Sequence, residues 1–100
     1  MKKRSTMKRL NVGGRLIEAV TVRGLADIIG KSRDAVFRYE ELGYFPPAPL
    51  KKGTYRYYPL TLCQRLKPIV AKFPVNRPPS AELIVEINKV FNEERNLLCQ

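Results

Sequence analysis

The sequence predicts a small domain that is mainly α-helical and contains one short β element. Three observations point to this fold class. Apolar residues recur at helical spacing in several segments, helix-capping residues flank these segments, and a stretch rich in Pro and Tyr between them disfavours helix. A length of 100 residues corresponds to one domain, and 44% hydrophobic with 28% charged residues is an ordinary globular composition.

The first two predicted helices are separated by a very short turn. Thr21 is a good N-cap for the first helix and Gly30 a good C-cap, while Ser32 caps a second helix that closes at residues 42–43. The apolar stripe of the first helix is Val22, Leu25, Ala26 and Ile29. Two short helices joined in this way form a helix-turn-helix, whose second helix enters the major groove of DNA; a plain αα-hairpin has the same pattern.

The second helix has two different faces. Val36 and Tyr39 are expected to point inward. The outward face comprises Arg33, Asp34, Phe37, Arg38 and Glu41. Arginine offers two donors to guanine, and an apolar ring can touch the methyl group of thymine, so this face suits base recognition. The alternative for Phe37 is that it packs under the following β element.

That β element is predicted from residues 44–58. Three prolines in residues 44–50 exclude a helix, and residues 55–58 contain strand-forming tyrosines. We expect strands near 44–50 and 54–58, with Lys51 and Lys52 at the tip, where they suit a phosphate backbone. Tyr58 is expected to point inward, and Tyr55 and Tyr57 to divide between packing and nucleic-acid contact.

A third and a fourth helix follow. The third is expected to begin near Pro59 and to be kinked or split at Pro68. Its apolar face is Leu62, Leu66, Ile69, Val70 and Phe73. After a Pro-rich linker at 74–79, Ser80 caps a final helix within 80–100. Its stripe of Leu83, Ile84, Ile87, Val90 and Phe91 is expected to fold back on the domain, or to pair with a second copy.

Charge is unevenly distributed along the chain. The net charge is +10, with 17 basic and 5 acidic residues in 1–79 but two basic and four acidic in 80–100. This distribution favours a polyanionic partner for the first part and a packing or assembly role for the tail. Residues 1–14 are expected to form a basic arm in which Lys2, Lys3 and Arg4 contact phosphates, with a turn at 11–14 before a short strand at 15–20.

Several function classes have no support in the sequence. His is absent, Cys63 and Cys99 lack C-x-x-C spacing, and Gly13-Gly14 is not followed by a phosphate-loop lysine. We therefore expect no enzyme activity, metal or cofactor, with Cys63 as a core residue and Cys99 as a thiol near the chain end. No membrane helix and no secretory signal are expected.

Residues 21–70 resemble the DNA-binding domain of the MerR family, a winged helix-turn-helix. The resemblance is carried by residues 21–26, 30–43 and 53–58, and its register continues to Leu66 and Ile69. It implies that the second helix reads the major groove, that Ser32-Arg33 begin this helix, that Tyr39 is its aromatic residue, and that Tyr55-Arg56 form the wing signature. The sequence departs from the family at Phe37-Arg38, where Arg followed by an aromatic is usual, at Thr54 and at Leu62.

The predicted fold is thus mainly α with a small β-wing, a winged helix-turn-helix at 15–73 plus a C-terminal helix. Typical family members have a long dimerisation helix and an effector region, whereas only about twenty residues follow the linker here. No small-molecule ligand is therefore expected, and homo-oligomers or side-by-side binding would use residues 80–98.

The expected function is sequence-specific binding of double-stranded DNA in transcription regulation, in a bacterial cytoplasm or as a phage protein in a host cell. Alternatives are an architectural accessory factor in excision, packaging or partition, a winged-helix module that binds proteins, and RNA binding. The predicted DNA-contacting residues are Arg23, Lys31, Ser32, Arg33, Phe37, Arg38, Tyr39, Lys51, Lys52, Tyr55 and Arg56.

Overall fold

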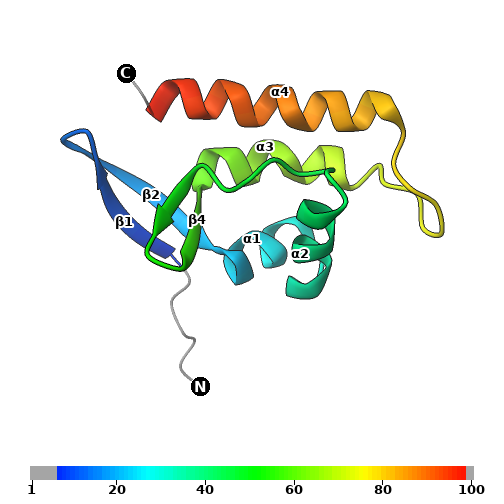
Figure 1. Cartoon of the computed structure of the whole chain (residues 1–100), viewed down its shortest axis with the longest axis horizontal. Helices are drawn as coiled ribbons and strands as arrows, with labels where there is room; N and C mark the ends of the chain where they lie inside the picture. The colour runs from blue at the N-terminus through cyan, green and yellow to red at the C-terminus, as the bar shows by residue number, and fades with distance from the viewer. Residues whose placement is uncertain (1–6, 99–100) are drawn as a thin grey trace.

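A four-stranded antiparallel sheet and four helices make up residues 7–98, the part of the chain that the computed structural model describes (Figure 1). The elements are β1 (Met7–Val12), β2 (Arg15–Thr21), α1 (Val22–Ile29), α2 (Arg33–Glu41), β3 (Leu50–Lys52), β4 (Tyr55–Pro59), α3 (Leu60–Val70) and α4 (Ala81–Leu98). The strand order in the sheet is β1-β2-β4-β3. Lys2, Lys3, Arg4 and Cys99, for which roles were predicted, lie outside the described residues.

The sheet corrects the predicted fold class. A mainly α winged helix is wrong, because the two-stranded element is one half of a larger curled sheet. Residues 7–12, expected within a basic arm, form β1 and pair with β2 from Met7↔Val20 to Val12↔Arg15. Most side chains of β1 are exposed, and the segment shows no clear alternation of apolar and polar residues that would predict a strand. It forms a strand because it pairs with β2.

The helix ends of α1 and α2 are confirmed. The Thr21 hydroxyl accepts a hydrogen bond from the Gly24 amide at 3.3 Å, and the Ser32 hydroxyl accepts one from the Ala35 amide at 3.1 Å. Gly30 ends α1 with a φ of 75°, a left-handed conformation that favours glycine. These features were predictable because each depends on residues a few positions apart.

The segment before the hairpin was assigned incorrectly. Residues 44–49 form a loop rather than a strand, and β3 contains only three residues. Proline has no N–H to donate to a sheet ladder, which excludes pairing along this stretch. The loop instead places Phe45 and Ala48 in the core, and the amides of Tyr44 and Phe45 both donate to the Tyr39 carbonyl.

Helix α3 begins after Pro59, as predicted, but it is not split at Pro68. The helix continues through Pro68 to Val70. Because this proline lies in the last turn, only the end of the hydrogen-bond ladder is affected and the preceding turns remain intact. Leu62, Leu66, Ile69 and Val70 are buried, and Phe73 packs at the edge of the same core.

Helix α4 folds back along α3, and α3 lies between α4 and the α1–α2 pair (Figure 1). Ile87 and Phe91 are completely buried, and the Phe91 and Phe45 rings lie 5.7 Å apart between centroids. Arg15 donates to the Leu97 carbonyl at 2.6 Å, which also ties β2 to the end of this helix. No helix within residues 7–98 has the length and apolar character required to cross a bilayer.

Candidate nucleic-acid interface

The outward face of α2 is open to solvent. Its residues Arg33, Asp34, Phe37, Arg38 and Glu41 are exposed, as predicted. Val36, on the opposite face, is buried and holds the helix on the core. The Phe37 side chain is the apolar exception on this face, and its exposed fraction of 39% leaves much of it available to a partner.

The tip of the β3–β4 hairpin carries both predicted lysines. Residues directly opposite in an antiparallel pair share one face of the sheet, so the Lys51↔Arg56 pair lies on one face and the Lys52↔Tyr55 pair on the other. Lys51, Lys52 and Tyr55 are exposed. Tyr58 points into the core as predicted, and its burial raises the pKa of its hydroxyl above the ordinary value.

Arg56 joins the hairpin to α2. Its Nη1 atom lies 2.9 Å from Oε1 of Glu40, and its guanidinium carbon lies 5.3 Å from the centroid of the Phe37 ring. Asp34, Arg38 and Glu41 complete a surface hollow of about 460 Å³ around this contact. The predicted Arg56 is therefore present in the groove between α2 and the hairpin, but with its charge paired to a carboxylate.

A second hollow lies where α1 approaches the start of α2. Its volume is about 350 Å³, and it brings together four of the predicted site residues, Arg23, Lys31, Ser32 and Arg33. Asp27 also lines it and offsets part of the positive charge. Residues from two helices and the turn between them thus form one basic cluster beside the exposed face of α2.

Tyr39 occupies a different environment from the other predicted site residues. Its ring packs against Tyr44 at 6.1 Å, and against Phe45 and Phe73 at 5.3 Å each. Burial raises the pKa of its hydroxyl. This aromatic cluster attaches α2 to the loop after it and to the segment that follows α3.

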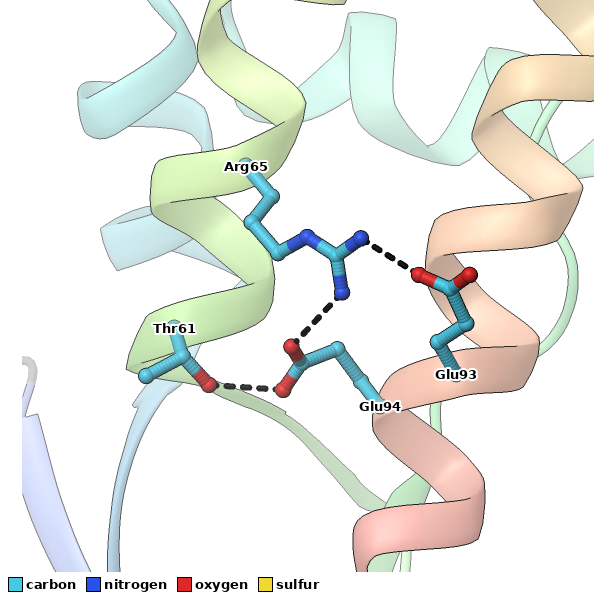
Figure 2. A network of polar contacts seen from close by, with 4 residues as sticks. All are labelled: Thr61, Arg65, Glu93 and Glu94. Carbon is cyan, nitrogen blue, oxygen red and sulfur yellow. Dashed lines mark hydrogen bonds and ion pairs between the residues drawn. The ribbon is translucent and has the colours of Figure 1, made fainter.

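A polar network between α3 and α4 was not predicted (Figure 2). Arg65 donates to Glu94 at 3.0 Å and to Glu93 at 2.5 Å, and the Thr61 hydroxyl donates to Glu94 at 2.6 Å. This pairing raises the pKa of Arg65 and lowers that of Glu93. One sequence signal pointed to it: Glu94 follows Phe91 by three residues and Ile87 by seven, a position within the buried stripe that requires a partner for its charge.

The network also corrects the charge analysis. Arg65 and Arg56 are among the 17 basic residues of 1–79 that favour a polyanionic partner, yet Arg65 is paired with carboxylates on α4 and Arg56 with one on α2. The basic side chains at the hairpin tip and around the start of α2 remain as the cationic part of the candidate interface. Within residues 7–98, no three potential ligand side chains of His, Cys, Asp or Glu are grouped so that they could hold a metal ion.

No protein-family model, curated protein or solved structure matches this chain.

Proposed function

We propose that this chain binds double-stranded DNA in a sequence-specific manner and regulates transcription. Helix α2 would enter the major groove while the β3–β4 hairpin contacts the adjacent backbone. The observation that carries the proposal is the junction of an exposed helix face with a lysine-bearing hairpin tip through Arg56. Helix α4 includes most of residues 80–100, the segment with a net negative charge. It packs on the side of α3 that faces away from α1 and α2 (Figure 1).

Base contacts would come from the exposed face of α2. Arg33 and Arg38 provide paired donors for the O6 and N7 atoms of guanine, and the Phe37 ring suits contact with a thymine methyl group. The carboxylates of Asp34 and Glu41 on the same face can accept from the amino group of cytosine. A face with both donors and acceptors is better suited to sequence discrimination than to uniform attraction by phosphates.

Backbone contacts would come from two sets of basic residues beside α2. Lys51 and Lys52 at the hairpin tip provide one set, with Tyr55 beside them for sugar and phosphate. The cluster around Arg23 and Lys31 provides the other set, at the start of the helix. The MerR resemblance of residues 21–70 supports the same division between helix and hairpin.

The proposal is tested by selecting bound duplexes from random-sequence DNA and measuring their affinity at several salt concentrations. If about six phosphates are neutralised, log K should fall with log salt at a slope near −5. Lys51→Gln and Lys52→Gln should each reduce that slope by about 1, whereas Lys89→Gln on α4 is the matched control and should leave it unchanged. An affinity that does not depend on salt, or selection that enriches no sequence, would overturn sequence-specific binding.

A further inference from the structure

We propose that Arg56 is a positioning residue that sets the distance between the hairpin tip and α2, rather than a residue that binds phosphate. The part of this inference that concerns DNA binding rests on the proposed function. Its structural basis is independent of DNA, because both partners of the Arg56 side chain belong to α2.

The contact is a single guanidinium held by two side chains. Phe37 and Glu40 are three residues apart and so lie on one side of the helix. The Arg56 side chain is 32% exposed and that of Glu40 is 21% exposed, which means that most of this ion pair is removed from water. If Arg56 turned toward a phosphate, it would lose the carboxylate and the ring together, and Glu40 would keep a half-buried charge without this partner.

The hairpin requires such an attachment because of the sheet topology. The last residue pair between β2 and β4 is Thr21↔Tyr57, and Leu50 of β3 lies opposite the same Tyr57. Residues 51–56 of the hairpin therefore extend beyond the end of the pairing with β2. A two-stranded hairpin is marginally stable by itself. Arg56 is the first β4 residue beyond the pairing with β2. Its contact with α2 holds the hairpin at the point where β2 no longer pairs with it.

The charge pattern of the hairpin points the same way. Lys51 lies directly opposite Arg56, and like charges at directly opposite positions destabilise a strand pair. Glu40 supplies a negative charge to Arg56 on this face and so offsets the repulsion. At this position of the β3–β4 pair, Lys51 is then the cation that remains available to DNA. Lys52 lies next to it on the other face of the sheet.

The two possible roles of Arg56 predict opposite effects of changing Glu40. If Arg56 bound phosphate, Glu40→Gln would release it and remove a negative charge from the interface, so affinity would increase. If Arg56 positions the hairpin, Glu40→Gln weakens the attachment and affinity decreases. Comparing Glu40→Gln, Arg56→Gln and the double variant therefore separates the roles, because the double variant has the same net charge as the native pair.

For the selected duplex we expect each single variant and the double variant to bind about tenfold more weakly than the native chain, with the double variant no weaker than the singles. The salt slope of the double variant should equal that of the native chain, whereas the control Lys51→Gln lowers it by about 1. Tighter binding by Glu40→Gln, or a double variant whose slope falls by about 1, would overturn the positioning role.

A measurement without DNA keeps this inference separate from the proposed function. Amide hydrogen exchange in residues 50–56 should be faster in Glu40→Gln and Arg56→Gln but no faster in Lys51→Gln, while exchange in α3 stays the same in all of them. Unaltered exchange in the hairpin would refute the positioning role. If the native chain bound no duplex while hairpin exchange still increased, the DNA-binding proposal would fail and the attachment by Arg56 would stand.

Discussion

The arginine–glutamate contact at the β3–β4 hairpin and the one between α3 and α4 lie in different surroundings. Arg56 meets one carboxylate, that of Glu40, at the edge of an open groove. Arg65 meets Glu93 and Glu94 between two packed helices, and the Glu94 side chain is only 7% exposed. The first contact orients an exposed hairpin, and the second satisfies a carboxylate that the packing of α4 has buried.

The two sides of the molecule differ in how far their aromatic side chains are buried and in how their charges are paired. Phe91 on the α4 side is completely buried, whereas Phe37 on the α2 side is 39% exposed. A net charge of +10 counts all basic residues alike, but those with carboxylate partners contribute less to the field that a polyanion meets. We therefore expect changes on the α3–α4 side to affect stability, and changes on the α2 side to affect binding.

The largest expected effect is that of Phe91→Ala. Removing a buried aromatic ring should lower the free energy of unfolding by about 3–5 kcal/mol, a large share of what a small domain possesses. Phe37→Ala is the control and should cost less than about 1 kcal/mol, because its ring is exposed and loses mainly the contact with Arg56. Urea denaturation measures both values, and equal losses would contradict the division between the two sides.

Arg38→Ala should affect binding without affecting stability. Its side chain is exposed on α2, and loss of a good paired contact with guanine costs about 1–3 kcal/mol and relaxes one position of the site. Repeating the duplex selection with the variant measures both effects. A uniform loss of affinity with the same preferred sequence would instead place Arg38 among the phosphate contacts.

Arg65→Met should affect stability without affecting the preferred DNA sequence. It leaves the buried Glu94 carboxylate with the Thr61 hydroxyl but without its cation, at a cost of about 1–2 kcal/mol, since Arg65 itself is partly exposed. Arg56→Met removes one ion pair and should cost less than about 1 kcal/mol, because the Glu40 side chain that it leaves without this partner is 21% exposed whereas that of Glu94 is 7% exposed. Thermal unfolding of the two variants sharpens the comparison, and a larger loss for Arg56→Met would reverse it.

The smallest effect concerns acid stability. Hydrogen bonding to Arg65 lowers the pKa of Glu93 below its ordinary value of 4.5. A carboxyl whose pKa is lowered by folding stabilises the native state above its unfolded value, and that contribution disappears as the pH falls through the folded value. The unfolding free energy of the native chain should therefore fall more steeply below pH 4.5 than that of Arg65→Met. Parallel profiles between pH 6 and 3 would show that the pairing contributes nothing.

Local features of the sequence determined the helices and their ends. Thr21, Gly30 and Ser32 act on amides and carbonyls within a few residues, so the α1–α2 unit was predictable with its boundaries. The outward face of α2 followed from helical spacing around Val36, whereas the apolar stripe of α4 left open whether the helix folds back or pairs with a second copy. The function assigned to that face stays a prediction that the binding experiments test.

The strands predicted at 15–20 and 54–58 are confirmed as β2 and β4, but only the tertiary structure decided how the sheet is completed and how the charges pair. β1 has mostly exposed side chains and exists because β2 lies beside it, and the prolines of residues 44–49 gave no indication of where β3 begins. Glu40 and Arg56 are 16 positions apart and Arg65 and Glu94 are 29 apart. Charged residues so far apart in the sequence come together only when the chain folds. Composition and residue spacing do not specify how far apart two elements lie in space, so they could not predict these ion pairs.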